Sequence, residues 1–197
     1  MSYQVKKLTP ELVEDYLYFF ENTAFCDDSA FAGCYCTWYH WSEEYEQEMN
    51  AGAEEEKGNY KKALAEKLVL QGKLNGFLAY DGDTVVGWCN ADDKQALSGI
   101  SKEKAPDIWD EGEEDKALSI VCFVTAPDMR GKGVARELVL AATAYAENNT
   151  YNYVEAYPAM GEFSVMNSNG PAPMFEKCGF EIKETPKGAF IARKYFA

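Results

Sequence analysis

The chain has 197 residues, of which 47% are hydrophobic and 14% aromatic, enough to pack one domain and too apolar for a disordered chain. Its 33 acidic and 19 basic residues give a net charge of −14, which argues against a nucleic-acid partner or an anionic membrane and favours a cationic substrate. The first residues lack the apolar core of a signal peptide, and no apolar run reaches the length of a membrane span. We therefore expect a cytoplasmic protein whose six cysteines are reduced thiols.

The first part of the chain carries signals for one strand and two helices. A short strand is predicted at 5–8, and Thr9 caps a helix whose apolar residues share one face. Residues 24–50 are aromatic and irregular. A second helix is predicted from about 55 to 71, because apolar residues recur there every four positions.

The middle of the chain carries strand signals. Two apolar runs around an Asp-Gly-Asp turn predict a hairpin over 75–91, and Gly87 marks a bulge in its second strand. The acidic stretch 107–115 is predicted to be a solvated loop. Residues 117–125 are almost entirely apolar, which is typical of a strand covered on both faces.

The last part of the chain is predicted to contain a helix, a strand, a short helix and two closing strands, at 133–147, 153–158, 171–178, 180–184 and 189–196. The strand-helix-strand order over 117–157 indicates a right-handed β-α-β unit. No internal repeat interrupts this order. The sequence therefore predicts an α/β (α+β) fold.

The turn at the start of the helix 133–147 is the most informative stretch of the sequence. A strand that leads into a glycine turn and a helix presents unpaired backbone N–H groups and the positive end of the helix dipole to an anion. Arg130, Lys132 and Arg136 add a local positive cluster to an acidic protein. Phosphate is the expected ligand, and a glycine turn with solvated basic residues is the alternative.

Three phosphate-binding motifs can be compared with this turn. A nucleotide P-loop needs Ser or Thr after Gly-Lys, but Gly133 follows Lys132. A dinucleotide fingerprint needs a third glycine where Arg136 stands, and too few residues follow the β-α-β unit to complete that fold. The remaining pattern is Arg-x-x-Gly-x-Ala, spelled by Arg130, Gly133 and Ala135.

That pattern resembles a known family. CFVTAPDMRGKGVARELV, at 122–139, resembles the acetyl-CoA motif of the GNAT N-acetyltransferase superfamily, and NGPAPMFEKCGF, at 169–180, resembles its second motif. Together the motifs cover about 120–180, at the family's usual separation and with a strand between them. The resemblance implies a mixed, mostly antiparallel central sheet that is splayed at its middle and flanked by helices. It also implies a single domain over 1–197, with 24–73 as the acceptor-side segment.

The same resemblance implies acetyl-CoA as co-substrate and no metal. The pyrophosphate would lie on the backbone amides of 130–135, and the pantetheine arm would pair with the backbone at the end of the 117–125 strand. The cofactor-binding residues implied in this way are Phe123, Val124, Arg130, Gly131, Lys132, Gly133, Val134, Ala135, Asn167 and Phe175. Asn167 has the alternative of merely shaping its loop.

The implied reaction is direct attack of a primary amine on the thioester in a ternary complex, and it needs a base and an acid. Many relatives carry a tyrosine where this chain has Phe175, and a phenyl ring cannot protonate the departing thiolate. Tyr157 is the candidate substitute. Glu155, a carboxylate in an apolar strand, is the candidate base, and a glutamate on a partly exposed strand face is the alternative.

The irregular segment 32–47 collects aromatic, thiol and imidazole side chains. Its aromatic residues would line the acceptor site or simply pack in the core, and the candidates for substrate binding are Trp38, Tyr39 and Trp41. Cys34, Cys36 and His40 lack zinc-site spacing and a fourth ligand, so no metal site is predicted.

The sequence thus predicts an acetyl-CoA-dependent N-acetyltransferase that acts on a small-molecule or peptide amine, one that is cationic. A non-catalytic acyl-CoA-binding sensor on the same fold is the runner-up, because Phe175 occupies the usual position of the acid. The third alternative is an interaction scaffold that binds no cofactor, and it requires that the glycine turn has no ligand. The acceptor, the acyl chain length and the oligomeric state stay open, a homodimer among the alternatives.

Overall fold

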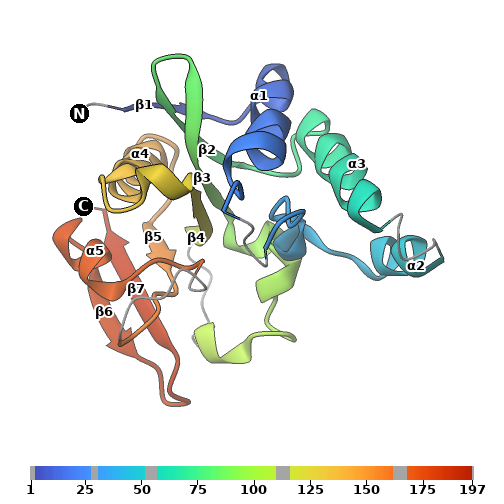
Figure 1. Ribbon diagram of the computed structural model, residues 1–197. Helices are drawn as coiled ribbons and strands as arrows, with labels where there is room; N and C mark the ends of the chain where they lie inside the picture. Colours follow the sequence, from blue (N-terminus) through green and yellow to red (C-terminus); the bar gives the residue numbers. More distant parts are fainter. Residues whose placement is uncertain (1–2, 28–30, 52–56, 110–115, 162–167, 197) are drawn as a thin grey trace.

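One mixed sheet organises the chain, with the strand order β1-β2-β3-β4-β5-β7-β6 (Figure 1). The computed structural model describes residues 3–27, 31–51, 57–109, 116–161 and 168–196. The strands in these ranges are β1 (Gln4–Lys7), β2 (Gly76–Asp81), β3 (Thr84–Asp93), β4 (Ala117–Thr125), β5 (Tyr153–Ala156), β6 (Glu181–Glu184) and β7 (Phe190–Tyr195). Only β4 and β5 pair in parallel among these strands, so the predicted mixed, mostly antiparallel α/β sheet is confirmed.

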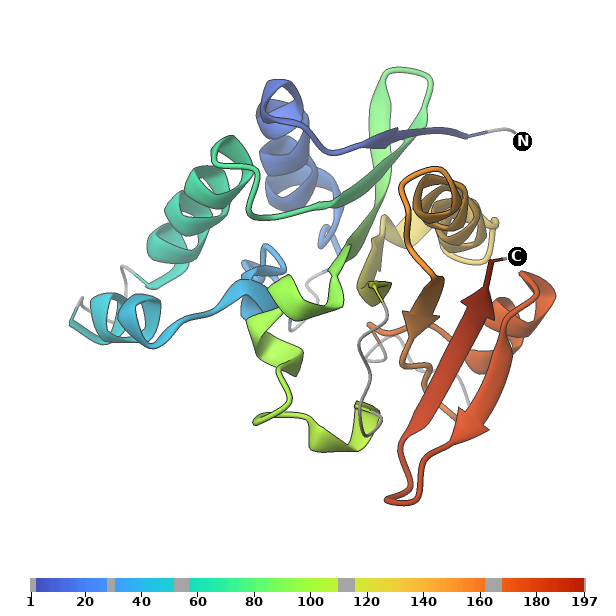
Figure 2. The same ribbon diagram turned by 180° about the vertical axis from the view of Figure 1, so that it is seen from behind.

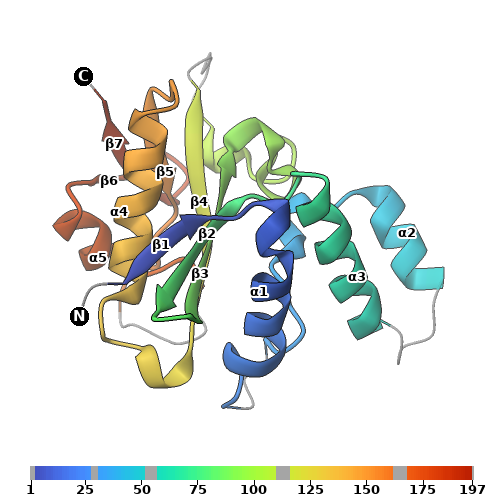
Figure 3. The same ribbon diagram turned by 90° about the horizontal axis from the view of Figure 1, so that it is seen from above.

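Helices cover both faces of the sheet (Figure 3). On one side lie α1 (Val13–Tyr18) and α3 (Lys57–Leu70), and on the other lies α4 (Val134–Glu147). The short α5 (Ala172–Lys177) leads into the β6–β7 hairpin. No helix in the described part of the chain is long and apolar enough to cross a membrane.

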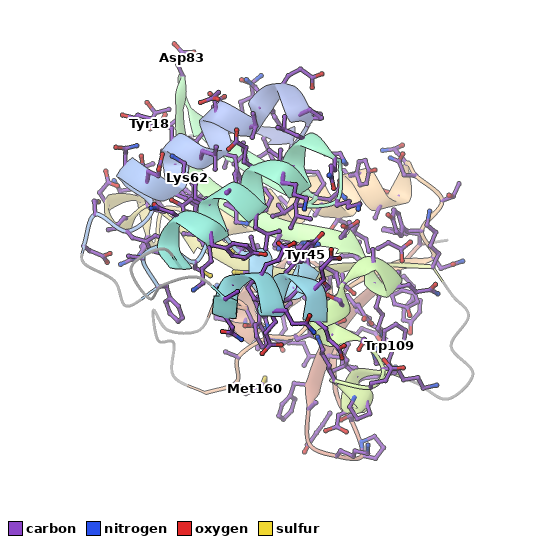
Figure 4. All side chains as sticks on the ribbon, turned by 90° about the vertical axis from the view of Figure 1, so that its right-hand side faces the viewer. Tyr18, Tyr45, Lys62, Asp83, Trp109 and Met160 are labelled. Atoms are coloured by element: carbon purple, nitrogen blue, oxygen red, sulfur yellow. The ribbon has the colours of Figure 1, made fainter. Side chains whose placement is uncertain are left out.

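The sequence did not predict α2 (Glu43–Ala51), which extends from the far end of α3. None of its side chains is buried, so it carries no apolar period that a sequence pattern could reveal. In Figure 4, which looks onto the side formed by these helices, Tyr18, Lys62 and Tyr45 mark α1, α3 and α2. The segment 24–73 therefore contains one more helix than its sequence indicates.

The sheet is splayed between β4 and β5, as the family resemblance implies. The two strands pair only over Ala117–Ile120 and Tyr153–Ala156, and β4 then continues to Thr125 beside β3 alone. The register with β3 shifts at this point and leaves Val121 without a partner, which makes a bulge where the pairing ends.

Helix α4 is seated on β3 through a glycine. The β2–β3 register shifts between Ala79 and Tyr80, so the bulge predicted at Gly87 is confirmed. A Cβ atom on Gly87 would stand 2.4 Å from Cγ1 of Val134, the first residue of α4. The missing side chain therefore lets the first turn of α4 lie directly on the sheet.

We predict that Gly87→Ala destabilises the protein by about 1–3 kcal/mol, because the added methyl group overpacks the β3–α4 contact. Urea denaturation measures the loss. Adding Val134→Ala removes the colliding methyl groups, so the double variant should be more stable than the sum of the single losses. Additive losses would show that the contact with Val134 is not the constraint.

Candidate active site

A cavity of about 580 Å³ opens where β4 has left β5. Four parts of the chain form its walls: the glycine turn, the end of β4, the segment around α5 and the segment that follows α1. Its lining residues are Phe25, Phe31, Cys34, Cys36, Trp38, Tyr39, Cys122, Phe123, Val124, Thr125, Met129, Arg130, Gly131, Gly133, Val134, Ala135, Arg136, Ser168, Gly170, Pro171 and Met174.

The glycine turn has the backbone geometry of an anion cradle. Gly131 and Gly133 have φ angles of +74° and +89°, which favour glycine, and no atom lies within 4 Å of the position of a Cβ atom on either. Gly133 is the N-cap of α4 and provides no side-chain cap to the first helical N–H groups. The turn therefore offers open space and the positive end of a 14-residue helix to a phosphate.

Two arginines beside the turn hold acidic partners at its surface. The Arg130 guanidinium lies 2.6 Å from a carboxylate oxygen of Asp27, and that of Arg136 lies 2.7 Å from Glu137. Such partly exposed pairs are weak, so a phosphate can compete for both arginines. Lys132, in contrast, is exposed and lies outside the cavity lining.

Phe175 does not reach the cavity, which corrects its assignment as a cofactor-binding residue. It is fully buried and packs against Phe123 and Phe180, with ring centroids 6.1 and 5.5 Å away. A phenyl ring has no hydroxyl to keep solvated, so burial of Phe175 in the core is favourable. Its neighbour Met174 lines the cavity. Asn167 lies outside the described residues.

The backbone of Phe123 is already engaged on the splayed side of β4. Its N–H donates to the Ser168 carbonyl oxygen at 2.6 Å, so the segment after residue 167 pairs with the strand where a pantetheine arm was expected. The side chains of Phe123 and Val124 nevertheless line the cavity. A pantetheine arm that pairs with the Phe123 amide would have to displace Ser168.

Glu155, the candidate base, is a buried carboxylate that is held between two cations. It is fully buried, with Oε1 at 2.8 Å from the Lys94 Nζ and Oε2 at 2.9 Å from the Arg193 Nε. Lys94 comes from the connection between β3 and β4, which runs between the 37–41 turn and the β6–β7 hairpin in Figure 2. Glu155 does not line the cavity, and both carboxylate oxygens are occupied by cations.

Tyr157 belongs to the same network and cannot act as the missing acid in this position. Its hydroxyl donates to Glu155, and Ser119, the register partner of Glu155 on β4, lies 3.0 Å away. Burial, and then the charge of Glu155, raise the pKa of Tyr157 well above its ordinary value. The proton of Tyr157 is therefore held by Glu155, away from the cavity.

The three aromatic candidates for substrate binding divide into two groups. Trp38, which is 61% exposed, and Tyr39 line the cavity. Trp41 packs edge-on against Tyr60, and its carbonyl accepts a hydrogen bond from Ser98. Trp41 is thus part of the packing that holds the other two rings in place.

A cluster of thiols on the cavity wall was missed from the sequence. Cys34, Cys36 and Cys122 all line the cavity, and the Cys36 and Cys122 sulfurs are 3.2 Å apart. The Cys-x-Cys spacing of Cys34 and Cys36 is visible in the sequence. No local sequence pattern indicates that these residues lie beside Cys122 on β4. Over the described residues no group of three His, Cys, Asp or Glu side chains is placed to hold a metal ion.

His40, the only histidine, lies behind this cluster. It is buried, and burial lowers its pKa. Its Nε2 atom is 3.3 Å from the Asn90 side-chain oxygen, and the Asn90 amide donates to the Cys36 carbonyl at 3.1 Å. The imidazole therefore supports the turn that carries the thiols and does not enter the cavity.

Comparison with known proteins agrees with the two motifs. The profile of the Acetyltransferase (GNAT) family matches residues 35–180. No curated protein sequence matches the chain.

Solved structures share the fold over the whole chain. A polyamine N-acetyltransferase of Drosophila melanogaster has 12% identity and a TM-score of 0.57, with 99% of this chain and 100% of that chain covered. A mosquito arylalkylamine N-acetyltransferase-like protein has 12% identity and a TM-score of 0.56, with the same coverage. The PaiA N-acetyltransferase of Thermoplasma acidophilum, solved with coenzyme A, has 19% identity and a TM-score of 0.50, with both chains fully covered.

We predict that Glu155→Gln lowers the free energy of unfolding by about 3–5 kcal/mol, because it removes the buried carboxylate that both Lys94 and Arg193 contact. Urea denaturation followed by fluorescence measures this loss. The control is Lys187→Ala, which breaks an exposed pair with Asp107 and should cost less than about 1 kcal/mol. A stable Glu155→Gln protein that selectively loses activity toward amines of high pKa would restore Glu155 as the base.

Proposed function

The chain belongs to the Acetyltransferase (GNAT) family, and we propose that it transfers the acetyl group of acetyl-CoA to a primary amine by direct attack in a ternary complex. The observation that carries this proposal is one cavity that joins the glycine turn to the rings of Trp38 and Tyr39. Direct transfer requires donor and acceptor to be held side by side, and a shared cavity supports such an arrangement.

The residues at the turn fit acetyl-CoA. The backbone amides around Gly131 and Gly133 and the start of α4 would hold the pyrophosphate, with Arg130 and Arg136 as its charge partners. Met129 and other apolar lining residues suit the arm that carries the thioester. Acetyl-CoA supplies the activated acetyl group, and the protein supplies position and proton transfer.

The acceptor side favours a cationic amine. The net charge of −14 attracts cations, and the exposed face of Trp38 beside Tyr39 can bind an ammonium group or its alkyl chain. The names of the two insect neighbours, which specify polyamine and arylalkylamine N-acetyltransferases, support an amine acceptor at the level of chemical class. A small molecule and a peptide amine both suit these features.

Such an amine must lose a proton before it can attack. For an amine of pKa about 10.4, deprotonation at pH 7 costs roughly 4.6 kcal/mol. Glu155 and Tyr157 are locked in a buried network, so the cavity needs another proton acceptor if the protein is an enzyme. The same observation is what favours a non-catalytic acyl-CoA sensor as the second candidate.

We predict that acetyl-CoA raises the melting temperature of the protein and that free CoA is released when a suitable amine is present. Gly133→Val should abolish the thermal shift, because its side chain would fill the open side of the turn. Thermal shift and a thiol reagent for free CoA measure the two effects. Thermal stabilisation without turnover toward any amine would support the sensor.

Gly188→Val is the matched control for Gly133→Val. Gly188 has φ +86°, close to the +89° of Gly133, so a side chain strains both positions equally, but Gly188 lies in the β6–β7 turn. The control should lose similar stability and keep the full acetyl-CoA shift. Equal loss of the shift in both variants would mean that backbone strain, and not the turn, is responsible.

We predict that Trp38→Ala raises the KM for a cationic amine about 3- to 30-fold with little change in kcat, as expected for loss of one cation–π contact. Steady-state kinetics with saturating acetyl-CoA measure this. Tyr18→Ala serves as the control, because Tyr18 is equally exposed, at 62%, but lies outside the cavity. An unchanged KM in Trp38→Ala would remove Trp38 from the acceptor site.

A further inference from the structure

A strained turn presents two of the three thiols to the cavity. Tyr35 and Cys36 have φ angles of +47° and +46°, a left-handed conformation that costs a non-glycine residue about 1–2 kcal/mol. The carbonyls of both residues are held from the core, by the hydroxyl of Tyr16 and by the side-chain amide of Asn90. Both anchors are fully buried. Strain that its surroundings enforce in this way is typical of sites where side-chain position matters.

The thiols form a hydrogen-bonded chain. The Cys36 sulfur lies 3.2 Å from that of Cys122 on β4, where either thiol can donate, and Cys34 precedes Cys36 by two residues on the same cavity wall. Hydrogen bonds from Cys36 lower the pKa of Cys34 to about 6. The neighbouring thiols of Cys122 and Cys34, and burial, raise the pKa of Cys36 well above its ordinary value, so Cys36 keeps its single proton.

The titratable groups around Cys34 do not oppose ionisation of its thiol. The titratable groups that interact with it or with its two neighbours include Lys61 from α3, Tyr16 from α1, Tyr39 and the buried Cys89 on β3. Lys61 favours the thiolate, whereas burial raises the pKa of both Tyr16 and Tyr39 and keeps these hydroxyls neutral. Cys34 is therefore the group in this cluster that carries a negative charge at neutral pH.

The cavity provides no other obvious proton acceptor. Its described lining residues include no carboxylate and no histidine. Glu155 is paired on both oxygens, and Phe175 lacks the hydroxyl that would protonate a leaving thiolate. Among the described lining residues, the three thiols are thus the groups closest to one another that can accept and return a proton.

We propose that Cys34, Cys36 and Cys122 form a proton relay, in which Cys34 takes a proton from the acceptor amine and Cys122 returns one to the departing CoA thiolate. This proposal rests on the proposed amine acetylation. The carbon–nitrogen bond forms as the carbon–sulfur bond breaks. The ammonium gives up two protons in all. The first passes by way of Cys34 to solvent before the attack, and the second leaves the nitrogen for Cys34 as the carbon–nitrogen bond forms. Two shifts, from Cys34 to Cys36 and from Cys36 to Cys122, then replace the proton that Cys122 gives to the CoA thiolate, so one proton is released overall and no oxidant is needed.

The first test measures the thiols without catalysis. Alkylation of each cysteine in the free protein by iodoacetamide, followed by peptide mass spectrometry, gives the pH at which each thiol ionises. Cys34 should be half-reactive near pH 6, and the exposed Cys26 serves as the internal reference for alkylation in the same samples. Cys36→Ala should move the Cys34 midpoint to higher pH, and Cys36→Ser, which keeps a donor, should leave it low.

The second test measures the reaction. Cys34→Ser and Cys122→Ala should each lower kcat by about 10²-fold or more while the acetyl-CoA thermal shift stays intact. The acid limb of the kcat/KM profile, where activity falls as pH drops through the pKa of Cys34, should move upward in Cys36→Ala. The pKa of the amine is the same for every variant. A difference in the acid limb between variants therefore reports ionisation of a group in the protein. Cys26→Ser is the control and should behave as wild type.

Three results would overturn the relay. The first is a Cys34→Ser variant that keeps the kcat and the pH profile of the wild type. The second is a protein that acetylates amines although its Cys34 is alkylated with the pH midpoint of an ordinary thiol. The third is an acetyl group found on Cys34 after incubation with acetyl-CoA alone, which would make Cys34 a nucleophile. If no amine is acetylated at all, the proposed function fails together with the relay, whereas the first two results defeat the relay alone.

Discussion

The ion pairs of Glu155 fix the point at which the sheet divides, and the cavity depends on that point. The carboxylate, on β5, contacts Ser119 on β4, Arg193 on β7 and Lys94 in the connection between β3 and β4. Parallel pairing of β4 with β5 ends one residue later, at Ile120. A charge that is costly to bury stays where both of its oxygens are satisfied, so this network holds four parts of the chain in one arrangement.

Beyond this junction, small local features turn an open sheet into a site. The unpaired Val121 lets β4 change its register as it leaves β5, and Phe123 then pairs with the segment that carries Ser168. Gly87 on β3 has no side chain, so Val134 can pack directly against it. This contact places the start of α4 and its glycine turn at the same end of the sheet. The glycine turn and the rings of Trp38 and Tyr39 therefore share a cavity because they depend on the same strand ends.

Local patterns were enough to predict the strand 117–125, the helix α4 and the glycine turn, since apolar runs and glycines act on their own neighbourhood. The role of Glu155 was not predictable, because its partners Lys94 and Arg193 come from distant elements whose approach only the fold determines. Trp38 and Trp41 look equivalent in the sequence, and a short 3₁₀ turn over Thr37–His40 separates their roles. Pairing of a Cys-x-Cys turn with a cysteine on β4 likewise has no sequence signal.

In the proposed reaction, the distribution of charge would separate recruitment of an amine from its deprotonation. A net charge of −14 attracts cations over long range, yet the described lining of the cavity contains no carboxylate. A carboxylate beside the acceptor would stabilise the ammonium form and raise its pKa, which opposes attack, whereas apolar walls lower that pKa by desolvation. A thiolate that already accepts two hydrogen bonds becomes neutral once it takes the proton. Acidic residues at the surface and thiols inside thus suit a protein that must attract an ammonium ion and then remove its charge.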